Sequence, residues 1–264
     1  MMGRLEGKVA VIIGASGAGS MGQQTARRMA EEGAKVVVAA RRKEPLDALA
    51  ADIGGTAIAC DISDEAQVEA VAKCAVDTYG GLDIAVNFAG INVQGPIAEI
   101  TAESMKDAID IHFVGSILFL KHMANTMASR GGGSIITAST LTAVLGSGGM
   151  AAYAGTKAGV DNIVRIAASE YGKMNVRVNS ITPGLVRSEM TEGVFAGMPA
   201  IAKAFEIETR LPRLGTIDDI ANTCVFLGSD EAFITAQNIQ VNGGADMGHA
   251  PTPADFAAAG AELG

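Results

Sequence analysis

The sequence is poor in the residues that build disulfide frameworks, metal sites and membrane spans. Its 264 residues include three isolated cysteines and three scattered histidines, and no Cys-x-x-Cys spacing occurs. We therefore expect no disulfide framework, no metal site and a reduced, cytoplasmic protein. A cytoplasmic location also fits an N-terminus that runs directly into a strand-like segment without a signal-peptide pattern. The longest apolar stretch near the middle, Phe113 to Leu120, is far too short for a membrane span, so we expect no membrane partner.

Basic charge is also scarce. The chain has 20 Lys and Arg residues against 29 Asp and Glu residues, which gives a net charge of −9. A nucleic-acid-binding domain is expected to carry a basic face, so we expect no nucleic-acid partner. Hydrophobic residues make up 48% of the sequence, enough for the core of one large domain.

Short apolar runs alternate with helical patterns along the whole chain. The predicted strands are Val9–Ile13, Lys35–Ala39, Thr56–Ala59, Ile84–Asn87, Ser134–Ala138, Arg177–Ile181 and Asn238–Val241. The predicted helices are Met21–Glu32, Glu44–Ile53, Glu65–Tyr79, Ala102–Ser129, Ala152–Tyr171 and Asp218–Leu227, with Ser63 as the expected N-cap of the third. Continuous apolar runs are typical of parallel strands that are buried on both faces. The pattern predicts a single α/β domain over residues 1–264, with helices on both faces of a doubly wound parallel sheet of about seven strands.

Two segments fall outside this alternation. Residues 189–212 are apolar and interrupted by Pro199, and we expect them to form a lid over a substrate pocket, with Met190 and Met198 as adaptable contacts. Residues 250–264 form a C-terminal tail rich in Ala, Gly and Pro.

A glycine-rich loop connects the first strand to the first helix. Glycines at this place permit a tight turn and a close approach of the backbone to a pyrophosphate, and the helix N-terminus offers free N–H groups. The loop therefore predicts a dinucleotide site in a Rossmann-type fold, formed by Gly14, Ser16, Ser20, Met21 and Gly22. A common spacing puts glycines at offsets 0, 4 and 6, where this chain has Gly14, Ala18 and Ser20, so the loop is longer than usual.

The end of the second strand bears on the choice of cofactor. An acidic residue there would hold the ribose hydroxyls, but this chain reads Ala40-Arg41-Arg42 and has no acid before Glu44. Two guanidinium groups can bind a 2′-phosphate, so we expect NADP(H), with NAD(H) possible. The alternative is a solvated basic turn.

Tyr153 and Lys157 stand four residues apart on a predicted helix, which places them on the same face. A lysine ammonium beside a phenol favours the phenolate, so we expect Lys157 to lower the pKa of Tyr153. Such a phenol can protonate a carbonyl oxygen or accept a proton from an alcohol. The alternative is an ordinary surface pair of a tyrosine and a lysine.

These motifs together resemble the classical short-chain dehydrogenase/reductase family. The likeness extends from Gly7 to Gly244 and includes Asp61, Asn87-Phe-Ala-Gly90, Tyr153-x-x-x-Lys157 and Pro183-Gly184. The resemblance implies that Lys157 also binds the nicotinamide ribose. It implies further cofactor contacts from Asp61 and Ile62 at the adenine, from Asn87, Ala89 and Gly90 along the cleft, and from Pro183, Gly184, Val186 and Ser188 at the nicotinamide.

Two positions depart from the family pattern. The catalytic serine of the family stands thirteen residues before the tyrosine, where this chain has Thr140, preceded by Ser139. A threonine hydroxyl can donate the same hydrogen bond to a substrate carbonyl, so we assign the role to Thr140. His112 stands where the family carries an asparagine that helps to hold a water linked to the lysine. The histidine either replaces this relay or is a packed helix residue.

The resemblance, which includes members similar to 3-oxoacyl-carrier-protein reductases and hydroxysteroid dehydrogenases, implies an oxidoreductase that interconverts a secondary alcohol and a ketone. A 3-oxoacyl thioester, a steroid or a smaller cyclic or aromatic ketone would each suit an apolar pocket. One rival is an enoyl-thioester reductase, because the long loop, with Gly14 followed by Ser20 and Met21, resembles the loop of that branch of the family. That branch spaces its tyrosine seven residues before the lysine, where this chain has Met150. The other rival is a non-catalytic nucleotide sensor on the same fold, which would tend to lose the pair of Tyr153 and Lys157.

The resemblance also implies a homotetramer, or a dimer, built through the two long helices. Their apolar positions beyond one core-facing stripe are Ile109, Phe113, Ile117, Leu120, Val160, Ile163 and Ala167.

Overall fold

A computed structural model describes residues 3–263 of the chain. A parallel sheet of seven strands runs through its centre, in the order β3-β2-β1-β4-β5-β6-β7. The strands are β1 (Val9–Ile13), β2 (Lys35–Ala40), β3 (Thr56–Ala59), β4 (Ile84–Asn87), β5 (Gly133–Ala138), β6 (Val176–Pro183) and β7 (Asn238–Val241). The predicted doubly wound α/β sheet is confirmed, and each predicted strand lies within one residue of its place, except that β6 is longer.

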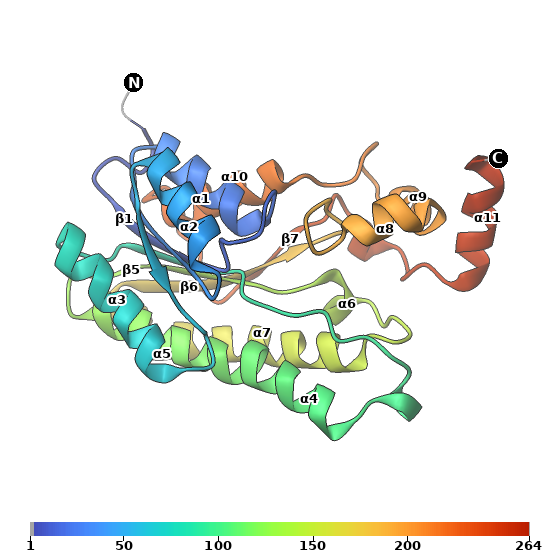
Figure 1. Cartoon of the computed structure of the whole chain (residues 1–264), viewed down its shortest axis with the longest axis horizontal. Helices are drawn as coiled ribbons and strands as arrows, with labels where there is room; N and C mark the ends of the chain where they lie inside the picture. The colour runs from blue at the N-terminus through green and yellow to red at the C-terminus, as the bar shows by residue number, and fades with distance from the viewer. Residues whose placement is uncertain (1–2, 264) are drawn as a thin grey trace.

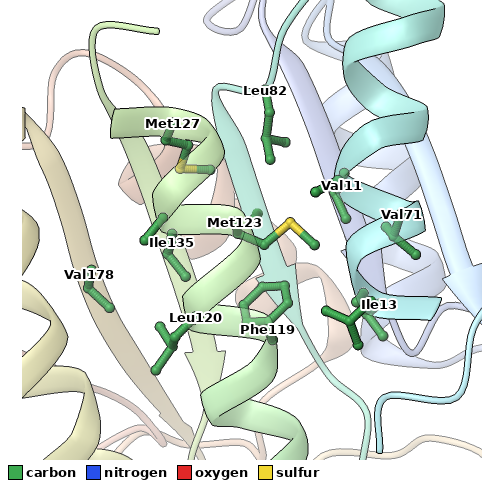
Figure 2. Packing of buried hydrophobic residues seen from close by; sticks show 14 of the residues in the cluster. Val11, Ile13, Val71, Leu82, Phe119, Leu120, Met123, Met127, Ile135 and Val178 are labelled. Carbon is green, nitrogen blue, oxygen red and sulfur yellow. The ribbon is translucent and has the colours of Figure 1, made fainter. Parts of the chain in front are cut away.

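Helices cover both faces of the sheet (Figure 1). On one face lie α1 (Met21–Glu31), α2 (Lys43–Ile53) and α10 (Ile217–Gly228), and on the other lie α3 (Glu65–Tyr79), α5 (Gly115–Ala128) and α7 (Ala151–Tyr171). Each layer buries its own hydrophobic cluster against the sheet. Figure 2 shows the second of these, where Phe119 and Met123 of α5 lie toward Val11 and Ile13 of β1, and Leu120 lies toward Val178 of β6. Close packing on both faces fixes the strands, and so fixes the loops at their carboxyl ends.

The chain order reverses between β1 and β4. The strands β1, β2 and β3 progress in one direction from this point, and β4 to β7 progress in the other. The loops after β1 and β4 therefore leave in opposite directions and open a crevice at the carboxyl edge, the usual ligand site of such sheets. The glycine-rich loop follows β1 directly, so the topology puts it at this crevice.

The predicted helix over residues 102–129 is not a regular α-helix. It consists of α4 (Ala102–Ala108), a π-helical segment η2 (Ile109–Val114) and α5. The wider π turns re-aim the side chains in the middle, and such segments are often found at functional sites. His112 lies in this segment and is fully buried. Sequence periodicity correctly predicted helical structure over these residues, but it did not predict the π-helical segment in the middle.

Other short elements lie between the main ones. They are η1 (Ile97–Glu99), α6 (Leu141–Val144), η3 (Gly172–Met174) and η4 (Ala245–Met247).

The N-cap of α3 is Asp64, whose carboxylate accepts from the backbone of Gln67, so the prediction of Ser63 was wrong. Ser63 instead donates to Asp61.

The two segments outside the alternation are mostly helical. Residues 189–212 contain α8 (Glu192–Gly197) and α9 (Pro199–Glu208), and the tail contains α11 (Pro253–Leu263), which packs against α9 (Figure 1). Backbone hydrogen bonds from Arg210 and Leu211 to Gly243 fix the far end of residues 189–212. Within residues 3–263, none of the helices combines the length and the apolar character that a membrane crossing requires.

Candidate active site

The crevice between β1 and β4 is shaped by glycines that no other residue can replace without a shift. Gly14 has a φ of +90°, and a Cβ there would lie 2.6 Å from the backbone nitrogen of Ala89. A Cβ on Gly22 would lie 2.4 Å from the carbonyl oxygen of Gly14. The start of α1 is therefore pressed against the end of β1, which points the helix N-terminus into the crevice. Ser20 caps this helix by accepting a hydrogen bond from the backbone of Gln23 at 3.2 Å.

A cavity of about 710 Å³ occupies the crevice. Its volume lies within the usual range for cofactor sites of roughly 300–1,000 Å³. Most of the predicted cofactor residues line it, namely Gly14, Ser16, Ser20, Met21, Gly22, Arg41, Arg42, Asp61, Ile62, Ala89, Gly90 and Ser188. The cavity thus fits a dinucleotide: glycines line one wall, an N-terminal helix end faces it, and it is long enough to reach from β2 to η2.

The remaining predicted cofactor residues do not line this cavity. Asn87 is buried, and its side chain accepts from the backbone of Ala89 at 2.9 Å, so it shapes the loop rather than facing the opening. Val186 points into the core. Pro183 ends β6, and Gly184 packs closely against Asn242. The structure therefore does not place Asn87, Pro183, Gly184 or Val186 against this cavity.

At the end where the adenosine of a dinucleotide would lie, called the adenosine end below, the side chains are exposed and ionic. Arg42 contacts both Ser16 and Glu189, and its Nη2 lies 3.2 Å from a carboxylate oxygen of Glu189. Asp61 accepts two hydrogen bonds from Ser63, which, with the nearby charge of Arg41, lower its pKa. Asp61 therefore stays a carboxylate in the range where most proteins work.

The other end of the site lies beyond Gly90. A Cβ on Gly90 would lie 3.2 Å from Nε2 of His112 and 3.8 Å from Nζ of Lys157. Because Gly90 also lines the cavity, the catalytic candidates and the cavity are neighbours. Any larger residue at this position would fill the space between them.

Tyr153 and Thr140 lie together at this end. Tyr153 is half-buried near the start of α7, and Thr140 follows β5 as the N-cap of α6. Burial raises the pKa of Tyr153, while a hydrogen bond with the Thr140 side chain acts in the opposite direction. The expectation that Lys157 lowers the pKa of Tyr153 is wrong for this arrangement, because loss of water around the phenol dominates and the lysine points elsewhere.

Lys157 is almost completely buried, with 6% of its surface exposed. Its Nζ donates to the carbonyl oxygen of Ala138 at 2.8 Å, at the carboxyl end of β5. Burial lowers its pKa to about 8, and the charge of Asp161 opposes that shift. The ammonium is thus held at the sheet edge beside Gly90, with donors to spare for a ligand.

His112 uses both of its ring nitrogens inside the protein. Nε2 accepts from the backbone N–H of Ile91 at 3.0 Å, which leaves the proton on Nδ1 to donate to Thr156 at 2.9 Å. Burial and the charge of Lys157 lower the pKa of His112 to about 3, so the ring is neutral. Its ring meets that of Tyr153 edge-on, with centroids 5.4 Å apart. This geometry matches a packed residue that fixes the loop after β4, because neither nitrogen is left over for a relay water.

Ser139 and Thr140 point in different directions, although they are adjacent. The Ser139 hydroxyl donates to Asp161 of α7 at 2.6 Å, and Ser180 of β6 donates to the other oxygen of that carboxylate at 2.7 Å. Ser139 therefore helps to tie α7 to the sheet. Thr140 alone of the two contacts the phenol.

Sequence reasoning missed several residues that line the cavity. They include Gly17, Phe88, Ile91, Ile111 and Glu189. Gly17 and Phe88 could have been found from the motifs to which they belong. Glu189 could not, because its contact with Arg42 joins residues that are 147 positions apart. Within residues 3–263, no group of three or more His, Cys, Asp or Glu side chains is arranged to hold a metal ion.

Comparison with known proteins gives consistent matches. Residues 14–246 match a family model described as enoyl-(acyl carrier protein) reductase. A 2,5-dichloro-2,5-cyclohexadiene-1,4-diol dehydrogenase of Sphingobium indicum is 36% identical over 254 residues, which cover 94% of this chain and 100% of that protein. The mitochondrial borneol dehydrogenase of Lavandula x intermedia is 34% identical over 253 residues, with 92% of each chain covered.

A bacterial reductase and a solved structure extend these matches. The 3-oxoacyl-(acyl-carrier-protein) reductase of Staphylococcus aureus is 34% identical over 247 residues, covering 91% of this chain and 98% of that protein. A short-chain type dehydrogenase/reductase from Mycobacterium ulcerans superposes with a TM-score of 0.89 at 29% identity, covering 94% of this chain and 93% of that chain.

Proposed function

Because the chain belongs to the short-chain dehydrogenase/reductase family, we propose that it interconverts a secondary alcohol and a ketone, with NADP(H) preferred over NAD(H). The observation that carries the proposal is the hydrogen bond between Tyr153 and Thr140, together with the position of the Lys157 ammonium next to Gly90, which lines the cavity. A nicotinamide dinucleotide, held in the cavity, would supply or accept the hydride.

Each of these residues has a role that its surroundings support. The raised pKa of Tyr153 keeps the phenol protonated, which is the form that can give a proton to a carbonyl oxygen. Thr140 lies beside the phenol and polarises the same carbonyl oxygen through its hydroxyl. Lys157 presents a buried ammonium beside Gly90, where it can bind ribose hydroxyls. In the oxidation direction, Tyr153 accepts the proton of the alcohol instead.

The preference for NADP(H) is supported by the end of β2. Ala40, Arg41 and Arg42 line the cavity, and no carboxylate stands at position 40 to hold ribose hydroxyls. Arg41 is exposed and forms no hydrogen bond within residues 3–263, so its guanidinium is free to meet a phosphate.

The substrate class that we favour is an apolar ketone or secondary alcohol. Met190 and Ile91 are apolar residues that line the cavity, and residues 189–212 act as the lid in this proposal. The names of two relatives, which act on borneol and on a cyclohexadienediol, support cyclic alcohols, and the 3-oxoacyl reductase of Staphylococcus aureus, at similar identity, makes carrier-bound thioesters the second substrate class.

The direct test is a substrate panel with purified protein. Cyclic secondary alcohols, their ketones and 3-oxoacyl thioesters are offered with NADPH or NADP⁺, and turnover is followed by the absorbance of the reduced cofactor. We expect turnover of the cyclic compounds, and no turnover of any carbonyl or alcohol would contradict the proposal. A non-catalytic nucleotide sensor would bind the cofactor but give that negative result.

An enoyl-thioester reductase is the second candidate, since the matching family model carries that description and the loop is long. Its tyrosine position is occupied by Met150, which has no ionisable proton and serves here as the N-cap of α7. Including an enoyl thioester in the panel separates the two activities, because only a C=C reductase would consume NADPH with it.

We propose that the protein is cytoplasmic and assembles as a homotetramer, or alternatively as a dimer. Of the apolar positions on the long helices, Leu120, Val160 and Ala167 are buried in the chain's own core. Ile109 and Ile117 are instead 39% and 41% exposed, and Ile166 on α7 is 49% exposed. Covering these side chains with a second copy would remove apolar surface from water. Light scattering that gives a monomer mass at micromolar concentration would exclude this assembly.

A further inference from the structure

The ion pair of Arg42 and Glu189 closes the adenosine end of the cavity. Arg42 belongs to the turn between β2 and α2, and Glu189 belongs to the segment that follows β6. Both residues line the main cavity of about 710 Å³ and a second cavity of about 460 Å³ that lies between α1 and α2. The pair therefore forms the partition between the two spaces.

The contacts of Arg42 leave it little capacity for a further ligand. Nη1 and Nη2 both donate to the carboxylate of Glu189, at 3.2–3.3 Å. Nε donates to the hydroxyl of Ser16, and Nη2 also donates to the carbonyl oxygen of Ser16, each at 3.3 Å. Each nitrogen of the guanidinium group is engaged, and Nη1 alone keeps one N–H without a partner among the described residues, so a phosphate that takes two hydrogen bonds from Arg42 must displace one of these partners.

The residues on either side of Glu189 fix the turn that carries it. Ser188 donates its backbone N–H to Oγ1 of Thr191 at 2.9 Å, and Thr191 returns a backbone hydrogen bond to Ser188 at 3.0 Å. Thr191 also donates to the carbonyl oxygen of the buried Val186. A Cβ on Gly17 would lie only 2.2 Å from Oε2 of Glu189, so the carboxylate rests against the glycine-rich loop itself.

We propose that Glu189 is a specificity-determining residue, whose carboxylate competes with the 2′-phosphate of an NADP-type cofactor for Arg42. It thereby reduces the preference for NADP(H) that the two arginines would give alone. This inference rests on the proposed function, because it requires that Arg42 take part in binding the 2′-phosphate. The same carboxylate repels the pyrophosphate of both cofactors alike, so the ratio of the two affinities isolates the competition.

The test uses two fragments that differ by the one phosphate. Calorimetric titration measures the binding of adenosine 2′,5′-bisphosphate and of adenosine 5′-monophosphate to the wild type and to Glu189→Gln. We expect the substitution to raise the affinity for the bisphosphate about three- to fivefold relative to the monophosphate, since an exposed charge pair is worth up to roughly 1 kcal/mol, which is about fivefold in affinity. Glu192→Gln is the matched control, because Glu192 pairs with Arg187 in the same segment at 3.1 Å, and it should leave the ratio unchanged.

Variants of Arg42 separate this inference from the cofactor preference itself. If Arg42→Gln leaves the ratio of the bisphosphate affinity to the monophosphate affinity unchanged, Arg42 does not bind the 2′-phosphate. In that case the part of the proposed function on which this inference rests is wrong. If Arg42→Gln lowers the ratio while Glu189→Gln changes nothing, the competition alone is overturned. In the Arg42→Gln background, the gain from Glu189→Gln should fall below about twofold, because the unpaired and half-exposed carboxylate can turn toward water. A gain that persists there would indicate simple repulsion and would also overturn the competition.

Discussion

The catalytic end and the adenosine end of the cavity hold their polar side chains in different ways. At the catalytic end, His112 and Lys157 are buried and each is fixed by hydrogen bonds to the backbone of neighbouring loops. At the adenosine end, Arg42 and Glu189 keep 57% and 47% of their side-chain surface exposed, and they contact each other at 3.2–3.3 Å. The arrangement at the catalytic end therefore depends on packing, and the arrangement at the adenosine end depends on charge.

This difference has consequences for how each end responds to change. Burial shifts the pKa of Tyr153 upward and those of Lys157 and His112 downward, because the protein interior disfavours the charged form of each group. Such shifts are little affected by salt. Interactions between exposed charges are screened by salt and contribute little individually, so the adenosine end can change its preference without a loss of fold.

The largest effect is expected from removing the phenol at the catalytic end. Tyr153→Phe should lower the rate of ketone reduction by ~10²–10⁴-fold, because no other group there can supply the proton. Cofactor binding should persist, as measured by titration with NADPH. If more than about a hundredth of the rate remains, Tyr153 is not the general acid.

The next effect distinguishes two adjacent hydroxyls. Thr140→Ala should lower the rate by about 10²-fold, as expected for the loss of a donor to a developing oxyanion, and Thr140→Ser should retain activity. Ser139→Ala should instead cost about 1 kcal/mol of stability, since the Asp161 carboxylate loses one of its two donors. Initial rates and denaturant unfolding separate the two. A severe loss of rate at Ser139 with a mild one at Thr140 would reverse the assignment.

At the adenosine end, the expected effect is on the choice of cofactor. NADPH should bind at least about tenfold tighter than NADH, and added salt should weaken that preference, because the arginines are exposed. Ala40→Asp combined with Arg41→Ala should turn the preference toward NADH. Dissociation constants measured at two salt concentrations test this. Equal or tighter binding of NADH by the wild type would contradict our interpretation of the end of β2.

The last effect concerns acid stability. His112 has a folded-state pKa of about 3 against 6.5 for the free side chain, so between these values the unfolded chain binds the additional proton. The stability contribution is therefore complete above about pH 6.5 and is lost as the pH falls toward 3, with a slope of up to about 1.4 kcal/mol per pH unit.

His112→Asn should remove this slope, and urea unfolding at a series of pH values measures it. His249→Asn changes a surface histidine, 56% exposed, and serves as the control. An unchanged slope in His112→Asn would show that other groups cause the acid sensitivity. That result would also contradict the burial-shifted pKa that distinguishes His112 from the exposed groups at the adenosine end.

Much of the fold could be predicted because it depends on local patterns. Apolar runs predicted the strands from β1 to β7, and the glycine-rich loop predicted the crevice beside β1. Boundaries were less accurate where capping decides them, as at Asp64, whose side chain takes the role predicted for Ser63. The α11 helix was described only as a tail, because a composition rich in Ala and Gly does not reveal the packing against α9.

The sequence by itself determined the order of the strands and helices, the position of the loop after β1, and the four-residue spacing of Tyr153 and Lys157. These features follow from the periodicity of backbone structure, which neighbouring residues specify. Only the tertiary structure decided that Lys157 turns to the carbonyl of Ala138, that His112 is neutral within a π-helical segment, and that Glu189 meets Arg42. Such contacts join residues that are distant in sequence, and burial, charge and hydrogen bonding at those places exist only after the chain has folded.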